Sequence, residues 1–235
     1  MLTVKFMDKN GILYIVATPI GNLEDMTLRA IRVLGEVDAI ACEDTRVTSK
    51  LLSHYNIAKP LISLHQHSGK VQFEKVLGKL EEGEDVAYCS DAGTPGISDP
   101  GNQLVAKALG REIKVIPIPG VSALGAIVSA AGMDMQKFAF WGFPPHKKGR
   151  ETFFRHVLAM DVPVVYYDSP HRVLKNIKLM TDLTHDKKID LVIGRELTKM
   201  FEQIVRGEAE KVLAYFEANP EKVKGEFVVI VQTGE

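Results

Sequence analysis

The sequence contains few of the residues that form metal centres or covalent cross-links. It has only two cysteines among 235 residues. Cys42 and Cys89 lie far apart, each at the end of an apolar run, and they do not have the paired spacing of a zinc site or a redox motif. We therefore expect no metal site, two reduced and buried thiols, and a cytoplasmic fold that needs no disulfides.

Long hydrophobic runs and an excess of one charge are also missing. The longest aliphatic stretches, such as residues 12–17, are far shorter than the roughly 20 residues that cross a bilayer. Asp8 and Lys9 interrupt the apolar residues near the start, so we expect neither a signal peptide nor a membrane partner. The net charge of −1 gives no global attraction to nucleic acid, so any such contact needs a local basic patch.

The hydrophobic pattern predicts an α/β protein with two domains. Five short apolar runs alternate with amphipathic segments, which indicates a mostly parallel sheet with flanking helices in an N-terminal domain of residues 1–132. Thr27 is expected to cap one helix, and Phe73, Val76, Leu77 and Leu80 form the buried stripe of another. The pattern changes near Gly132, and residues 133–235 predict a mixed α/β domain with antiparallel strand pairs. The expected strands are 11–17, 38–43, 61–64, 86–90, 113–118, 138–143, 162–167, 190–197, 202–207 and 226–232, with C-terminal helices at 172–183 and 208–219.

Three loops at the predicted strand ends are rich in glycine, proline and small residues. They are TPIGN (18–22), SDAGTPGISDPG (90–101) and IPGVSA (118–123). One such loop alone would be a plain turn, but ligands of open α/β sheets bind at the carboxyl ends of the strands, so three together favour a site. Neither a GxxxxGK motif followed by Ser or Thr nor the three-glycine dinucleotide fingerprint is present. The loops therefore predict an adenosyl ligand rather than a triphosphate or NAD.

Polar clusters elsewhere allow both catalytic and structural interpretations. Asp44 or Thr45 can cap a helix, and Glu43 suits the positive end of that helix. Glu196 and Lys199 can form a surface ion pair, and His171 and Arg172 can be a solvated first turn or contact an RNA phosphate. Proton transfer to a carboxylate, lysine or histidine would accelerate transfer to a hydroxyl by about 10²–10⁴-fold. The catalytic candidates are Glu43, Asp44, Arg46, Glu196 and Lys199.

The densest basic segment is GFPPHKKGR (142–150), which places Lys147, Lys148 and Arg150 near the aromatic residues Phe140, Trp141 and Phe143. A solvated linker is the ordinary interpretation of such a run. On a chain with almost no net charge, however, it is the best candidate for contacts to RNA phosphates. The HQH segment (65–67) has alternate histidines but no carboxylate or cysteine at ligand spacing, which argues against a metal site.

Seven segments, in this order, resemble one family of enzymes: ATPIGNLEDMTLRA, ACEDTR, SDAGTPGISDPG, IPGVSA, YYDSPHRV, GRELTK and GEFVVIV. The chain is similar to the small-subunit ribosomal RNA methyltransferase I family, a branch of the tetrapyrrole-methylase superfamily. The resemblance spans Gly11 to Val231 and implies a homodimer of two-domain chains. It also implies S-adenosylmethionine in a cleft between the domains and 2′-O-methylation of cytidine 1402 of 16S rRNA in the small ribosomal subunit.

The resemblance also implies which residues contact the cofactor. Many tetrapyrrole methylases have GGDP where this chain has DAGTP, so the individual roles of Asp91, Thr94 and Asp99 stay open. A tetrapyrrole methylase of cobalamin or sirohaem synthesis is the alternative enzyme, and a non-catalytic adenosyl-binding or ribosome-docking module is the alternative of another class. The implied cofactor contacts are Pro19, Asp91, Ala92, Gly93, Thr94, Ile97, Ser122, Ala123 and Tyr167.

Overall fold

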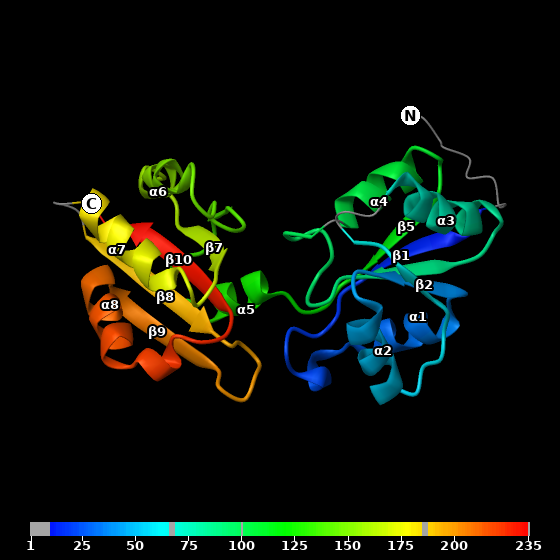
Figure 1. Cartoon of the computed structure of the whole chain (residues 1–235), viewed down its shortest axis with the longest axis horizontal. Helices are drawn as coiled ribbons and strands as arrows, with labels where there is room; N and C mark the ends of the chain where they lie inside the picture. Colours follow the sequence, from blue (N-terminus) through cyan, green and yellow to red (C-terminus); the bar gives the residue numbers. More distant parts are fainter. Residues whose placement is uncertain (1–9, 66–68, 100, 185–187, 235) are drawn as a thin grey trace. The chain divides into compact units, whose positions relative to one another are not determined.

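The chain divides into two compact units, residues Met1–Ser122 (unit 1) and Ala123–Glu235 (unit 2). The computed structural model describes residues 10–65, 69–99, 101–184 and 188–234. Figure 1 shows one central sheet in each unit.

Unit 1 is built on a five-stranded sheet in which every pair of neighbours is parallel. The strand order is β3-β2-β4-β1-β5. Both faces are covered, which explains why the inner strands β2 and β4 are buried throughout and read in the sequence as continuous apolar runs. The five predicted strands are confirmed as β1 (Ile12–Val16), β2 (Ala39–Cys42), β3 (Leu61–Ser63), β4 (Val86–Cys89) and β5 (Lys114–Ile118).

The helices of unit 1 cover the two faces of the sheet in pairs. α1 (Leu28–Glu36) and α2 (Thr45–His54) share one core cluster with the sheet, while α3 (Lys70–Glu81) and α4 (Gly101–Leu109) share the other. The connection after β1 therefore leaves toward one face, through the short helix η1 (Leu23–Asp25), and the connection after β4 leaves toward the opposite face. Because β1 and β4 are neighbours, their carboxyl ends form a topological switch point, where ligands of open α/β sheets bind.

Local signals in the sequence located these helices well. The hydroxyl of Thr27 accepts a hydrogen bond of 3.1 Å from the N–H of Ala30 and caps α1 as expected. The predicted stripe of α3 is confirmed, since all four of its apolar side chains are buried in the sheet-facing cluster. Cys42 and Cys89 are both buried and unbonded to each other, and burial raises the pKa of each thiol.

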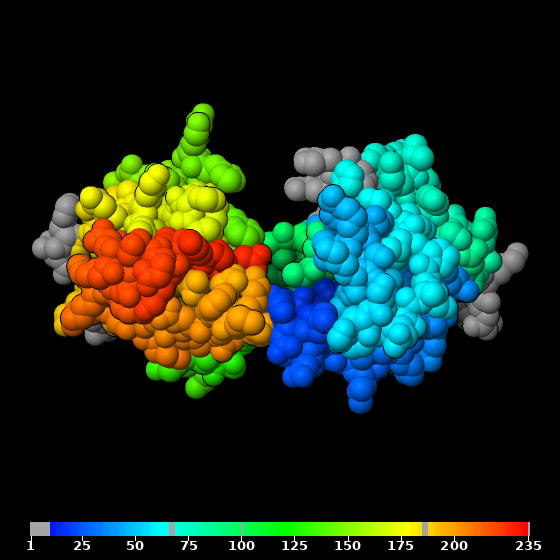
Figure 2. Space-filling model, turned by 60° about the horizontal axis from the view of Figure 1, so that its bottom comes forward, coloured from blue at the N-terminus to red at the C-terminus, as the bar shows by residue number. Residues whose placement is uncertain are grey.

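Unit 2 has a mixed sheet of order β6-β7-β10-β8-β9. β6 pairs with β7 in parallel, and the other three pairs are antiparallel, as predicted. α6, α7 and α8 pack on one face around a core that includes Phe154, Ile177 and Phe216, and α8 lies at the surface in the view of Figure 2. The elements are β6 (Ala139–Phe140), α6 (Arg150–Leu158), β7 (Val164–Asp168), α7 (Val173–Leu183), β8 (Ile189–Arg195), β9 (Gln203–Glu208), α8 (Ala209–Ala218), η2 (Pro220–Lys222) and β10 (Phe227–Thr233).

One helix of unit 2, α6, is absent from the sequence prediction. It begins after Gly149, which has φ of +88° and gives no side-chain cap, so the sequence contains no capping signal. The basic loop before it also has the composition of a linker, which concealed the start of the helix.

The units divide before the helix α5 (Ala123–Ser129), whereas the sequence pattern predicts the boundary after that helix, at residue 132. α5 packs with unit 2. Ile127 is fully buried and packs directly against Gly194 of β8. A Cβ added to Gly194 would lie 2.8 Å from the Cδ1 atom of Ile127. The Arg206 side chain also donates hydrogen bonds to the carbonyls of Ala130 and Ala131 just after the helix.

Candidate active site

The loops after β1 and β4 are joined directly at the switch point of unit 1. Thr18 and Gly93 form an isolated antiparallel bridge, with N–H to carbonyl distances of 2.9 and 3.0 Å in the two directions. Thr18 is buried, and its hydroxyl donates to the carbonyl of Ser90 at 3.2 Å. The two loops therefore form one connected backbone surface rather than two independent turns.

The third loop is tied to the second. The hydroxyl of Thr94 donates to the carbonyl of Val121 at 2.9 Å, and the N–H of Ala17 donates to the carbonyl of Ile118 at 3.2 Å. Gly93 lies between the loops with φ of +83°, and a Cβ there would be 3.2 Å from Cγ2 of Ile20. The left-handed backbone and the close approach of Ile20 both favour glycine at position 93.

Asp99 shapes the end of the second loop where it turns into α4. Its two carboxylate oxygens accept from the N–H groups of Gly96 at 2.7 Å and Gly101 at 2.8 Å. Gly96 and Ser98 both have positive φ values, of 92° and 65°. Asp99 therefore has a structural role in the loop, one of the three roles that the sequence left open. Pro100 lies outside the described residues.

An acidic pair connects the second loop to the end of β2. The N–H of Asp91 donates to a carboxylate oxygen of Glu43 at 3.2 Å, and the N–H of Asp44 donates to a carboxylate oxygen of Asp91 at 2.9 Å. Burial raises the pKa of Glu43; the hydrogen bond from Asp91 opposes this rise, and the nearby carboxylates of Asp91 and Asp99 add to it.

Asp44 and Arg46 are engaged at the start of α2. The Asp44 carboxylate accepts from the N–H of Arg46 at 2.8 Å, which caps the helix, and the two side chains form an ion pair of 2.6 Å. Hydrogen bonds from the Arg46 side chain and backbone lower the pKa of Asp44 to about 2. Asp44 therefore caps α2, which is one of the roles that the sequence left open for it.

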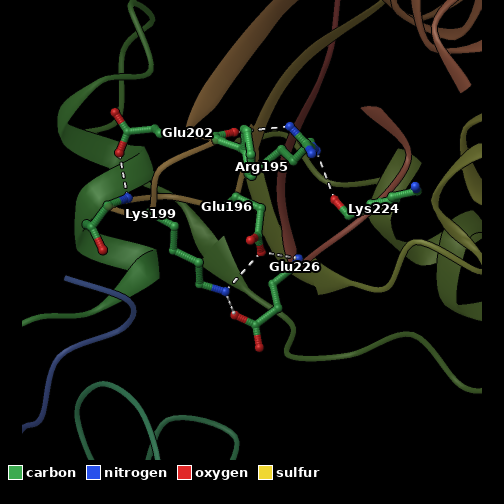
Figure 3. A network of polar contacts seen from close by, with 8 residues as sticks. Arg195, Glu196, Lys199, Glu202, Lys224 and Glu226 are labelled. Carbon is green, nitrogen blue, oxygen red and sulfur yellow. Dashed lines mark hydrogen bonds and ion pairs between the residues drawn. The ribbon is translucent and has the colours of Figure 1, made fainter. Parts of the chain in front are cut away.

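Glu196 and Lys199 belong to the connection between β8 and β9 in unit 2 (Figure 3). Lys199 donates to Glu196 at 2.9 Å and to Glu226 at 2.8 Å, and the N–H of Glu226 donates to the same Glu196 oxygen at 2.9 Å. Burial raises the pKa of Glu196, but these hydrogen bonds outweigh it and the net pKa is lowered. Burial lowers the pKa of Lys199, and its two carboxylate partners reverse this and raise it.

The same connection is held from its other side by Arg195. Its guanidinium is largely buried and donates to the carbonyls of Lys224 at 2.8 Å and Phe201 at 3.0 Å. Glu202 accepts from the N–H of Thr198 at 2.5 Å. All of these contacts brace the loop itself, so the local geometry gives Glu196 and Lys199 a structural role.

The basic segment and the SPHR motif meet in unit 2. Lys147, Lys148 and His171 are exposed, and Arg150 is the first, partly buried residue of α6. Arg172 differs from them because its guanidinium donates to the carbonyl of Pro144 at 3.0 Å and to the hydroxyl of Ser169 at 3.2 Å. Arg172 therefore holds the proline-containing loop against the end of β7.

Buried polar groups support this end of β7. Asp168 is buried, and its carboxylate accepts from the amide of Asn176 at 2.7 Å and from the N–H of Ser169 at 2.8 Å. Burial raises the pKa of Asp168 against these hydrogen bonds. The pair fixes the start of α7 relative to β7.

The implied cofactor contacts fall into two groups. The first group lies in unit 1, on the three loops that the contacts of Gly93 and Thr94 join, namely Pro19, Asp91, Ala92, Gly93, Thr94, Ile97 and Ser122. Ala123 is the first residue of α5 and Tyr167 lies in β7, so both belong to unit 2. α5 has seven residues.

Thr18 is the residue of this site that sequence reasoning undervalued. The segment TPIGN attracted notice for its proline and glycine, yet the buried threonine before them forms the bridge to Gly93. A polar residue at the end of an otherwise apolar strand was the available signal.

No group of three or more histidine, cysteine, aspartate or glutamate side chains is placed to hold a metal ion among the described residues. Of the HQH segment, residues 66 and 67 lie outside the described part of the chain. In the same described ranges, no helix is long and apolar enough to cross a membrane.

Comparison of the fold with solved structures gives two similar enzymes. A cobalt precorrin-4 methyltransferase of cobalamin biosynthesis superposes with a TM-score of 0.69 at 15% identity, covering 97% of this chain and 98% of the other. Uroporphyrin III C-methyl transferase from Thermus thermophilus superposes with a TM-score of 0.63 at 19% identity over 94% and 97% of the two chains. At these identities the likeness shows a shared two-domain fold.

Sequence comparison is more specific. The family Tetrapyrrole (Corrin/Porphyrin) Methylases matches residues 12–213. Proteins named ribosomal RNA small subunit methyltransferase I are 45% identical in a Synechocystis strain, over 94% of this chain and 78% of the relative, and 43% identical in Halalkalibacterium halodurans, over 96% and 77%. The relative in Borrelia garinii is 45% identical over 93% of this chain and 97% of its own length. The chain therefore belongs to the tetrapyrrole methylase family and, within it, to the group of the ribosomal RNA small subunit methyltransferases I.

Proposed function

We propose that this methyltransferase uses S-adenosylmethionine to methylate the ribose 2′-hydroxyl of a cytidine, cytidine 1402, of 16S rRNA in the small ribosomal subunit. The observation that carries the proposal is the identity of 40–45% to relatives that are named for the small-subunit RNA over nearly the whole chain. The tetrapyrrole enzymes share the fold at only 15–19% identity. A cytoplasmic homodimer is part of the proposal.

The connected loops of unit 1 fit an adenosyl group. Within the described residues, the backbone N–H groups of Ala92 and Thr94 donate to no protein acceptor, although their neighbour Gly93 is fixed on both sides. Such donors, held on a rigid backbone with small side chains, can recognise a base edge or a carboxylate without a cationic side chain. We assign the cofactor to Pro19, Asp91, Ala92, Gly93, Thr94, Ile97 and Ser122, with Ala123 and Tyr167 added from unit 2.

The cofactor supplies an electrophilic methyl group on a sulfonium. The protein would have to position the ribose oxygen for transfer of that methyl group, and such positioning contributes about 7–11 kcal/mol. In such a transfer the ribose hydroxyl would lose its proton, so a base of the protein has to accept it.

We propose Glu43 as that base. A general base works best when its pKa lies near the working pH, and Glu43 is the candidate carboxylate whose pKa is raised. Asp44 has a lowered pKa, Arg46 is bound to it, and Glu196 and Lys199 are bound in the network of Figure 3. The proton would pass to the Glu43 oxygen and then to water, with S-adenosylhomocysteine as the neutral leaving group.

We propose that Lys147, Lys148, Arg150 and His171 contact RNA phosphates. Arg172 was the fifth candidate, and its two hydrogen bonds within the protein favour a supporting role for it over a direct phosphate contact.

The test is methyl transfer from tritiated S-adenosylmethionine to purified small subunits that lack this modification. Alkaline hydrolysis of the product RNA should leave one phosphodiester bond intact, on the 3′ side of the methylated cytidine. The 2′-O-methyl group blocks the hydroxyl that would otherwise attack this bond. Label on the base, on a protein, or on a porphyrinoid substrate offered in parallel would overturn the proposal. Cofactor binding without turnover would instead support a docking module.

A further inference from the structure

An exposed phenylalanine beside the basic segment of unit 2 is held in place by its neighbours in the chain. Phe143 is 54% exposed. Its preceding residue, Gly142, accepts a 2.8 Å hydrogen bond through its carbonyl from the N–H of Tyr167, and its following residue, Pro144, accepts from Arg172 at 3.0 Å. The backbone on both sides of this ring is therefore fixed to β7 and to the start of α7.

The ring is also supported from below by other aromatic side chains. The Phe143 and Tyr167 ring centroids are 5.3 Å apart, and Tyr167 contacts Phe140 at 5.0 Å. Holding a large apolar ring in one position while its outer face stays in water is unfavourable, because no apolar surface on that face is buried in return. Such a ring is suited to a partner with a flat apolar face.

Charge near the ring indicates the class of that partner. The exposed ammonium groups of Lys147 and Lys148 follow Phe143 in the same loop, and the loop leads into Arg150 at the start of α6. Figure 1 shows this loop beside β7. A fixed aromatic ring next to several cations is the arrangement that binds single-stranded nucleic acid, since the ring stacks on a base while the cations neutralise phosphates.

We propose that Phe143 is a stacking platform for one unpaired base of the RNA substrate, next to the phosphate contacts of Lys147 and Lys148. The inference rests on the proposed action on RNA and adds to it the recognition of a base that is out of the helical stack. Tyr167 supports the ring from within the sheet and so ties the stacking platform to β7.

The experiment compares two probes that carry the same charge. One is a fluorescein-labelled oligocytidylate, and the other is a ribose-phosphate oligomer of equal length without bases. The full-length protein should prefer the first probe. In Phe143→Ala that preference should fall about five- to 150-fold, since a base stacked on an aromatic ring contributes roughly 1–3 kcal/mol.

Three further variants separate stacking from other causes. Phe143→Trp should keep the preference, and Phe201→Ala, which removes a ring that is 67% exposed in the other braced loop of unit 2, should also keep it. Lys147→Ala with Lys148→Ala should weaken both probes alike. On small subunits, Phe143→Ala should raise KM more than it lowers kcat.

The outcomes for the stacking platform and for the proposed function differ. Wild-type base preference and wild-type KM in Phe143→Ala, with methyl transfer to small subunits intact, would overturn the stacking platform only. Absence of binding to both probes together with absence of methyl transfer would overturn the action on RNA and the platform with it.

Discussion

The Gly93→Ala substitution tests whether the connected loops of unit 1 bind the cofactor. Gly93 has φ of +83°, and the new methyl group would lie 3.2 Å from Cγ2 of Ile20 and 3.7 Å from the carbonyl oxygen of Val121. The contact with Ile20 is tight enough to require a shift of a few tenths of an ångström. The backbone conformation is unfavourable for alanine whatever the space.

The expected cost follows from two routes that give similar values. If the loop keeps its shape, alanine in the left-handed region costs about 1–2 kcal/mol. If the loop relaxes, it loses the two hydrogen bonds with Thr18, of 2.9 and 3.0 Å, and each contributes about 0.5–1.5 kcal/mol. We therefore expect a loss of about 1–3 kcal/mol in the free energy of unfolding.

Cofactor affinity should fall with it, because the variant populates the bound shape of the loop less often. A penalty of about 1.4 kcal/mol on that shape weakens binding about tenfold. Calorimetric titration with S-adenosylmethionine measures the affinity, and denaturant unfolding measures the stability. A bulkier side chain, in Gly93→Val, should abolish measurable binding.

Gly35→Ala is the matched control. Gly35 lies within α1, a Cβ added to it would have no atom within 4 Å, and alanine there should stabilise the protein by about 0.5–1 kcal/mol with unchanged affinity. If Gly93→Ala bound the cofactor as tightly as the Gly35→Ala protein does, the loops of unit 1 would not form the binding surface and the reasoning would fail.

Three other predictions concern the proposed base Glu43, the hydrogen-bonded loop around Glu196, and the basic loop with Lys147 and Lys148. Because the pKa of Glu43 is raised, methyl transfer should be lost on acidification at a higher pH than an ordinary glutamate would give. Glu43→Gln should remove this acid limb, lower kcat about 10²–10⁴-fold and raise stability at neutral pH, where the partly buried charge is a cost. An unchanged pH profile would exclude Glu43. Gly225→Ala would put a Cβ 2.3 Å from the Glu196 carboxylate at φ of +84°, so the free energy of unfolding should fall by about 1–3 kcal/mol, and a wild-type melting curve would contradict this. Lys147→Ala with Lys148→Ala should lower the salt slope of RNA binding by roughly 1.5 without changing cofactor affinity, and an equal loss of both would refute the division of roles.

The control for the first of these predictions is Asp44→Asn. Asparagine caps a helix about as well as aspartate, so α2 should stay intact, and the acid limb should persist because Glu43 is still present. A lost limb in this variant would assign the titration to Asp44.

The sequence predicted the strands of unit 1 well because a parallel sheet covered on both faces makes each strand a short apolar run with small residues after it. It missed α6, which begins at a glycine in a left-handed conformation without a capping side chain. It also placed the domain boundary after α5, since only tertiary contacts, such as those of Ile127 and Arg206, show which unit that helix joins. These contacts have no local pattern in the sequence.

The candidate site was predictable to the level of its loops and not to the level of single side chains. Glycine and proline after strand ends mark where a loop approaches a ligand, and this is a local property. The role of Asp99 depends on two N–H groups that turn toward it only when the loop folds, and the role of Arg172 depends on a carbonyl 28 positions away in the sequence. Such partners are set by the fold.

Pairing explains why we propose one charged candidate as the base and give the others structural roles. A carboxylate with a cationic partner, such as Asp44 with Arg46, is stabilised in its charged form and becomes a weaker base. Glu43 instead loses water and faces other carboxylates, and among the described residues its hydrogen-bond donor is a backbone N–H, so it holds a proton more readily. A general base must take up a proton during the reaction, and a cationic partner would oppose this. We therefore propose Glu43, the candidate carboxylate without such a partner, as the proton acceptor.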